Sequence, residues 1–82
     1  MTVSGNQIRA ARALAGWEQR DLAEAAEVSI NTVRNMEACG ASIVRVRSDT
    51  LDHVIRALRQ GGVEFIPENG GGAGVRLRKQ SS

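Results

Sequence analysis

Glycines divide the first 62 residues into short segments, and this division constrains the fold more than any other feature of the sequence. Gly16, Gly40 and the pair at 61–62 each follow a run with helical spacing. Glycine commonly ends helices because it adopts the left-handed backbone conformation at little cost. The chain is therefore predicted to form a series of short helices.

Polar residues mark where the first two helices begin. Ser4 and Gln7 have the spacing of a capping box, which predicts a helix that starts after Ser4 and stops at Gly16. The second helix is predicted over residues 18–27, with Glu18 at the N-cap, where Ser, Thr, Asp or Asn would be better.

The third and fourth helices follow the same logic. Ser29 is the predicted N-cap of a helix that ends at Gly40. Residues 41–47 are rich in β-branched side chains and have no helical period. Ser48 is the predicted N-cap of a fourth helix, whose apolar positions have 3, 4, 7 spacing: Leu51, Val54, Ile55 and Leu58.

The last twenty residues change character. The runs "VEFI" (63–66) and "VRLR" (75–78) alternate between apolar and polar residues, and a loop rich in Asn and Gly separates them. This pattern predicts a β-hairpin. We therefore expect a mainly α domain over residues 1–62 and a short β-like extension with a frayed end over residues 63–82.

Composition excludes several classes of protein. A chain of 82 residues is one domain with a thin core. The single Cys39 excludes an internal disulfide framework, and the lone His53 lacks the companions of a metal site. No apolar run is long enough to span a membrane, and no secretory leader precedes the first helix. We expect a cytoplasmic protein without a cofactor and without a catalytic motif.

The third predicted helix has two contrasting faces. Its apolar residues step by three, at Ile30, Val33 and Met36, while the other face carries Asn31, Arg34 and Asn35. Positive charge also gathers near this helix and in the tail, although the net charge of the whole chain is only +2.

The stretch "LAGWEQRDLAEAAEVSINTVRNMEACG" (14–40) resembles the helix-turn-helix of the phage repressor and Cro family of regulators, also called the XRE family. The matching positions are Gly16, Gln19, Leu22, Ala23, Val28, Ser29, Val33 and Glu37. The resemblance covers about residues 6–40, and the fourth helix extends it to about residue 60. It implies a four-to-five-helix repressor-like domain whose third helix enters the major groove of double-stranded DNA.

Position by position, the resemblance implies roles in DNA binding. Base reading is expected from Ile30, Asn31, Arg34 and Asn35, and contacts to the DNA backbone from Gln19, Ser29, Thr32, Arg45 and Arg47. Asparagine suits adenine, and an apolar side chain suits the thymine methyl group. Alternatives remain open: Ile30 packs on the second helix, Arg34 is a solvated charge, and Asn35 is a plain surface residue.

Other residues have structural expectations. Arg12 and Glu37 occupy the positions of a family ion pair that ties the first helix to the third. Arg9 and Arg20 are equally open to phosphate contact or to a role in solubility. The family usually has glycine where this chain has Glu27, so a positive φ is expected there.

Dimerisation is assigned to the tail. Two strands in isolation are marginal in water, so we expect an intersubunit sheet with an interface formed by Val63, Phe65, Ile66, Val75 and Leu77. The alternative is that the hairpin covers its own helices and that the fourth helix forms the dimer.

These expectations combine into a function. The protein is expected to be a homodimeric, non-enzymatic regulator that binds an inverted repeat in promoter DNA and represses transcription, with no evident small-molecule effector. The alternative is a DNA-binding antitoxin that neutralises a partner protein through its tail. A non-specific DNA binder is disfavoured by the low net charge.

Overall fold

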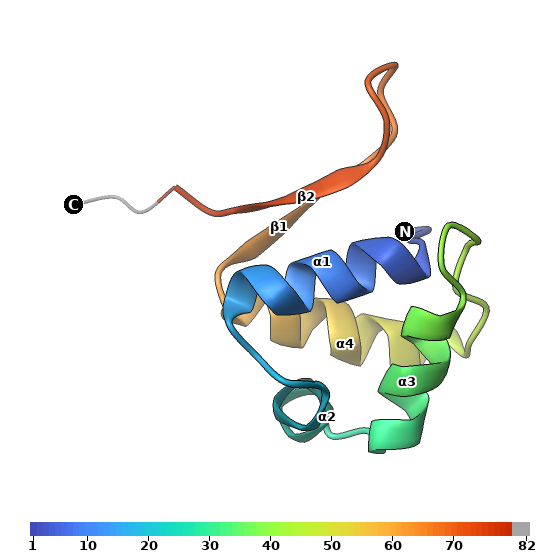
Figure 1. The fold of residues 1–82 in the computed structure, drawn as a ribbon, viewed down its shortest axis with the longest axis vertical. Coiled ribbons are helices and arrows are strands. Elements are labelled where there is room, and N and C mark those ends of the chain that lie inside the picture. The colour runs from blue at the N-terminus through green and yellow to red at the C-terminus, as the bar shows by residue number, and fades with distance from the viewer. Residues whose placement is uncertain (80–82) are drawn as a thin grey trace.

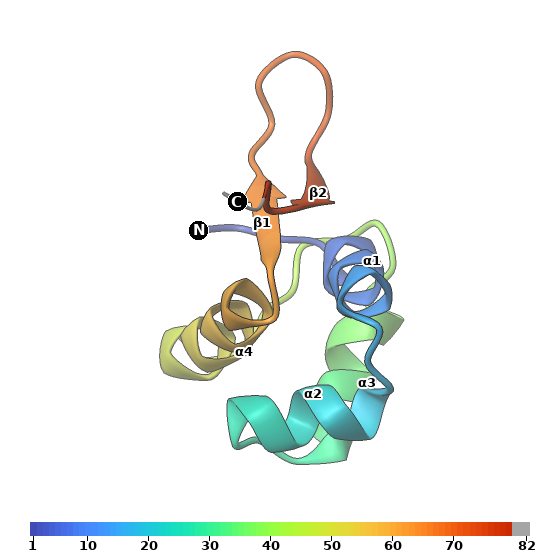
Figure 2. The ribbon, with the colours of Figure 1, turned by 90° about the vertical axis from the view of Figure 1, so that its left-hand side faces the viewer.

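The computed structural model describes residues 1–79. This part of the chain folds into α1 (Gly5–Ala15), α2 (Gln19–Ala26), α3 (Ile30–Ala38), α4 (Ser48–Gln60), β1 (Val63–Ile66) and β2 (Gly74–Leu77). The α2–α3 pair lies at one end of the molecule, and the hairpin loop projects from the other (Figure 1 and Figure 2). The prediction of a mainly α chain with a C-terminal hairpin is confirmed. The expected frayed end falls on residues 80–82, outside the described residues.

Local signals set the ends of α1. The Ser4 hydroxyl accepts a hydrogen bond from the Gln7 backbone N–H (3.1 Å), and the Gln7 side chain accepts one from the Ser4 N–H (2.9 Å). This is the predicted capping box. Gly16 closes the helix in the left-handed conformation, with φ of 75°.

The turn between α2 and α3 contains an unfavourable backbone conformation. Glu27 has φ of 58° and ψ of 42°, and it is the one non-glycine residue with positive φ among the described residues. For a residue with a Cβ, this backbone conformation costs roughly 1 kcal/mol. The expectation of a positive φ at Glu27 is confirmed, and the turn retains its left-handed shape without glycine.

The start of α4 differs from the prediction. Ser48 is the first helical residue and not the N-cap; that position belongs to Arg47, whose side chain makes no capping bond. The Asp49 carboxylate accepts the Thr50 N–H instead (2.9 Å). A carboxylate in the first turn of a helix is a good acceptor for its unpaired N–H groups, so the chain needs no serine cap here.

The core lies between the four helices and the inner face of the hairpin. Its fully buried side chains include Ile8, Leu22, Val33, Met36, Val54 and Leu58. Gly5 allows α1 to approach α3 closely, because a Cβ at this position would lie 2.5 Å from the Met36 carbonyl oxygen. No helix within residues 1–79 is both long and apolar enough to cross a bilayer.

The two strands that were predicted to form the dimer interface pair with each other within the chain. β1 and β2 are antiparallel, with Val63 opposite Leu77 and Phe65 opposite Val75. Val63 is fully buried, while Phe65 and Val75 pack partly on the core. β1 follows α4 after two glycines, so its inner face turns back onto the helices. Val63 therefore packs within its own chain, and the two strands pair with each other.

The residues on the hairpin's inner face differ in how much of their surface is buried. Leu77 lies on the same face as Val63, yet 55% of its surface is exposed. Ile66 is half-buried on the other face, where Arg76 and Glu64 form an ion pair at 2.9 Å. The described strands therefore cover the chain's own helices and present a mainly charged outer face.

Candidate nucleic-acid interface

α3 separates its apolar and polar residues cleanly. Val33 and Met36 are buried against the other helices. Asn31, Arg34 and Asn35 are exposed. Since helix neighbours recur three and four residues apart, these three side chains form one polar face along the helix. An amide, a guanidinium and a second amide on one face are donors and acceptors suited to the edges of bases.

Ile30 has an intermediate position. It is half-buried at the first turn of α3 and packs in part on the core. It also lines a shallow surface depression of about 420 Å³ together with residues of α2 and Arg34. Its exposed part can touch a ligand, but much of its side chain serves packing.

Hydroxyl groups gather at the N-terminus of α3. The Ser29 Oγ accepts the Thr32 backbone N–H at 3.1 Å, as predicted for the N-cap. The hydroxyls of Ser29 and Thr32 are 2.9 Å apart. The helix dipole makes this end of α3 favourable for an anion such as a phosphate.

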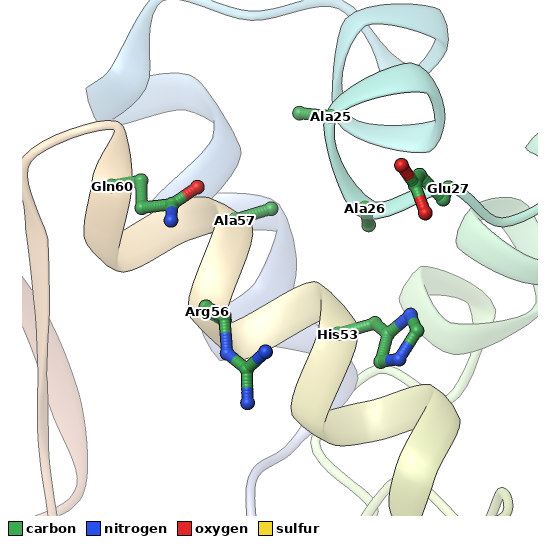
Figure 3. A pocket seen from close by; sticks show the side chains of 7 residues that line it. All are labelled: Ala25, Ala26, Glu27, His53, Arg56, Ala57 and Gln60. Carbon is green, nitrogen blue, oxygen red and sulfur yellow. The ribbon is translucent and has the colours of Figure 1, made fainter.

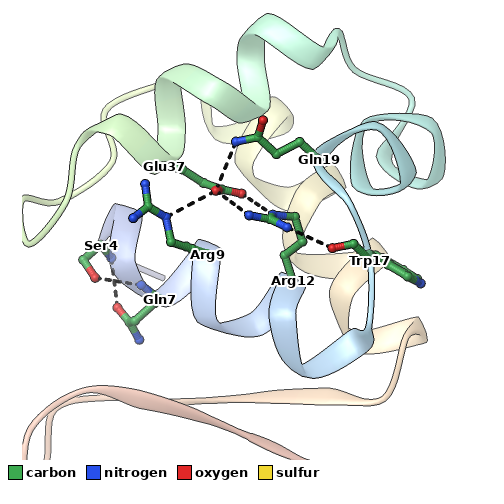
Figure 4. A network of polar contacts seen from close by, with 7 residues as sticks. All are labelled: Ser4, Gln7, Arg9, Arg12, Trp17, Gln19 and Glu37. Carbon is green, nitrogen blue, oxygen red and sulfur yellow. Dashed lines mark hydrogen bonds and ion pairs between the residues drawn. The ribbon is translucent and has the colours of Figure 1, made fainter.

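A buried carboxylate joins three helices behind this face (Figure 4). Glu37 on α3 is only 1% exposed and receives two hydrogen bonds from the Arg12 guanidinium on α1, at 2.7 and 3.0 Å. The Gln19 amide on α2 donates a third, at 3.2 Å. The ion pair expected between Arg12 and Glu37 is present, and it fixes the orientation of α3.

The charges in this network support one another. Burial alone raises the pKa of the Glu37 carboxyl, but the hydrogen bonds from Arg12 and Gln19 outweigh it, so the pKa lies below its ordinary value. The hydrogen bond to Glu37 raises the pKa of Arg12. Arg12 also donates to the Trp17 carbonyl oxygen (2.9 Å), so its guanidinium ties α1 to the start of α2 as well.

Gln19 therefore has a partner that the sequence did not reveal. Its amide nitrogen is committed in part to Glu37, eighteen residues away. The second amide hydrogen and the backbone N–H at the start of α2 are the groups that can reach a phosphate. No local signal could have identified this contact, because it depends on how α2 and α3 cross.

The basic residues outside α3 are exposed, and two of them lie close to a carboxylate. Arg45 and Arg47 lie in the loop before α4, and Arg47 forms an ion pair with Asp49 at 3.2 Å. Arg9 is 61% exposed and lies 3.5 Å from Glu37. Arg47 and Asp49 are two residues apart in the sequence, and this short spacing could have indicated their ion pair.

Acidic side chains border the N-terminus of α2. Glu18 and Asp21 both line the depression next to Arg34, and the Asp21 carboxylate accepts the Glu18 backbone N–H at 2.8 Å. The Glu-x-x-Asp spacing could have indicated this helix cap. These carboxylates repel an anion that approaches this end of α2.

A second groove lies between the C-terminal end of α2 and α4 (Figure 3). It has a volume of about 190 Å³ and is lined by Ala25, Ala26, Glu27, His53, Arg56, Ala57 and Gln60. Within residues 1–79, no three side chains of His, Cys, Asp or Glu are grouped closely enough to hold a metal ion.

Comparison of the sequence with protein-family models and with curated proteins found no match. The functional argument therefore depends on the chain's own residues and their arrangement.

Proposed function

We propose that the protein binds double-stranded DNA in a sequence-specific manner through a helix-turn-helix formed by α2 and α3, and that it represses transcription. The observation that carries this proposal is the exposed polar face of α3, held rigidly by the Glu37 network. An α-helix fits the major groove, where amides and guanidinium groups distinguish base pairs.

The proposed docking follows from the ends of the two helices. The N-termini of α2 and α3 carry Gln19 and the hydroxyl pair of Ser29 and Thr32, which are proposed to bind phosphates. Such contacts fix the register of a protein on DNA. Asn31, Arg34 and Asn35, with the exposed part of Ile30, then read bases, while Arg45 and Arg47 contact the backbone.

One recognition helix reads only a few base pairs. We therefore propose that two copies occupy an inverted repeat with half-sites about 34 Å apart. A bound dimer at a promoter would exclude polymerase, which accounts for repression without an enzymatic step.

The antitoxin alternative has less support. It relied on a tail that folds on a partner, whereas β1 and β2 pair with each other and pack on α1 and α4. Within residues 1–79, the loop of residues 67–73 projects away from the helices (Figure 2).

Selection of bound fragments from sheared genomic DNA tests the proposal. Near physiological salt, the protein is expected to enrich a short inverted repeat at one or a few promoters. Folded protein that enriches no motif would contradict sequence-specific binding.

Variants then test the reading face. Asn31→Ala and Arg34→Ala are each expected to cost about 1–3 kcal/mol at the selected site and little on random DNA. Arg56→Ala is the matched control, because it removes the same charge from the α2–α4 groove. Equal losses for Arg34→Ala on both kinds of DNA would mean that Arg34 binds phosphate only.

A further inference from the structure

We infer that Arg9 on α1 is a further DNA-backbone residue, which binds the same phosphate as Gln19 on α2. The inference rests on the proposed function for the identity of the ligand, a phosphodiester of double-stranded DNA. The anion site itself can be tested without DNA.

One carboxylate oxygen brings Arg9 and Gln19 together, although they come from different helices (Figure 4). The Gln19 Nε2 atom donates to the Glu37 Oε1 atom at 3.2 Å, and the Arg9 Nε atom lies 3.5 Å from the same oxygen. Two nitrogen donors beside one oxygen atom are close to each other. Since a phosphate group has several acceptor oxygens, a single phosphate can contact both side chains.

The charges around Glu37 leave the charge of Arg9 in excess. Arg12 donates to both oxygens of the Glu37 carboxylate, at 2.7 and 3.0 Å, and only 17% of the Arg12 side chain is exposed. Arg9 has one longer contact with the same carboxylate, and 61% of its side chain is exposed. Two guanidinium groups and one carboxylate give this cluster a net charge of +1. The exposed guanidinium of Arg9 presents that charge to solvent.

Both side chains keep donors for a ligand. Arg9 approaches Glu37 through Nε, and Figure 4 shows its two terminal nitrogens directed away from the carboxylate. A guanidinium that presents its terminal nitrogens matches two oxygens of a phosphate. The amide nitrogen of Gln19 has a second hydrogen that Glu37 does not take. A phosphate on the solvent side of Glu37 therefore finds donors from two helices.

Acidic neighbours give Arg9 a specific task. Glu18 and Asp21 line the depression beside Arg34 and repel an anion at the start of α2. The neutral amide of Gln19 does not offset this repulsion, whereas a guanidinium beside it does. Gln19 is thus expected to hold a phosphate only when Arg9 is present.

The first experiment measures how DNA affinity depends on salt. Binding to the selected fragment and to random duplex DNA is compared for wild type, Arg9→Gln, Arg9→Lys and Arg56→Gln. A residue that neutralises one phosphate contributes about one unit to the slope of log affinity against log salt concentration. Arg9→Gln should lose this unit and bind both DNAs about fivefold more weakly near physiological salt.

The other two variants are controls for this loss. Arg9→Lys keeps the charge and should keep the slope of wild type. Arg56→Gln removes the same charge from the α2–α4 groove and should change neither the slope nor the affinity.

Urea unfolding separates the inference from a purely structural role, in which Arg9 only helps Arg12 to hold Glu37. We expect Arg9→Gln to unfold at nearly the same urea concentration as wild type. An Arg9→Gln protein that keeps the salt slope of wild type would overturn the inference, whatever its affinity. A loss of affinity confined to the selected fragment would also overturn it, because Arg9 would then act through base reading by α3.

The second experiment uses inorganic phosphate as the probe. Proton–nitrogen NMR spectra follow the side-chain amide of Gln19 as phosphate is added to about 100 mM, a range that covers weak anion binding. Chloride at equal ionic strength is the reference. Wild type and Arg56→Gln are expected to show a saturating shift that is specific to phosphate, and Arg9→Gln is expected to lose it.

This result separates failure of the inference from failure of the proposed function. No phosphate-specific shift in wild type, or an equal shift in Arg9→Gln, contradicts the shared site even if a DNA motif is found. A shift that requires Arg9 supports the site even if no motif is enriched, and then only sequence-specific DNA binding is contradicted.

Discussion

Glu27 is the residue at which a local conformation and its side chain disagree. Its φ of 58° is costly for a residue with a Cβ, by roughly 1 kcal/mol. Glu27→Gly removes this cost, although the added freedom of the unfolded chain offsets part of the gain. We expect the melting temperature to rise by about 2–4 °C. Glu24→Gly, in the middle of α2, is the control and should lower it. A drop for Glu27→Gly as well would show that the Glu27 side chain stabilises the turn.

Glu37 is the second residue with a measurable effect, because its carboxylate makes the stability of the fold sensitive to acid. Its pKa is lower in the folded chain than the ordinary value of 4.5. Such a group stabilises the folded state fully above its unfolded pKa, and this contribution is lost as the pH falls through the lower folded pKa. The urea concentration at the midpoint of unfolding should therefore decrease when the pH is lowered below about 5. Glu37→Gln should cost about 3 kcal/mol near neutral pH, because it leaves Arg12 without its buried partner.

The control for this measurement is Glu24→Gln, which changes an exposed carboxylate of α2. It should leave both the midpoint at neutral pH and its acid dependence close to those of wild type. If Glu37→Gln retains the full acid dependence of wild type, other carboxylates are responsible.

At the scale of single elements, caps decide where α3 and α4 begin. Ser29→Ala removes the acceptor for the Thr32 N–H and should cost about 1 kcal/mol in the free energy of unfolding. Ser48→Ala is the matched control, because Ser48 is inside α4 and should be nearly neutral. Urea denaturation measures both. Equal losses would mean that Ser48 also contributes to the start of its helix.

At the scale of the whole molecule, the hairpin is part of the core. Val63→Ala should cost about 2 kcal/mol, because it opens a cavity between β1 and the helices. Leu77→Ala, directly opposite on the same face, should cost less than about 0.5 kcal/mol because Leu77 is exposed. Thermal or urea unfolding distinguishes the two. Similar small losses would indicate a hairpin that is detached from the helices.

Prediction succeeded where the interactions are short in sequence. The capping box of Ser4, the cap at Ser29, the terminating Gly16 and the left-handed Glu27 each depend on groups within about four residues. The alternation of apolar and polar residues in the tail likewise predicted the hairpin. The DNA-contacting roles of α3 remain predictions, because the fold exposes its polar face without testing what binds there.

The sequence by itself determined the helices, the caps at Ser4 and Ser29, the polar face of α3 and the hairpin, because hydrogen bonding and amphipathic spacing act locally. Only the tertiary structure decided that Val63 is buried while Leu77 is exposed, that Gln19 donates to Glu37, and that the N-terminal segment pairs with the loop after α3. These contacts join residues 14 to 39 positions apart. They depend on how closely helices approach and on which surfaces water leaves, and no short stretch of sequence contains that information.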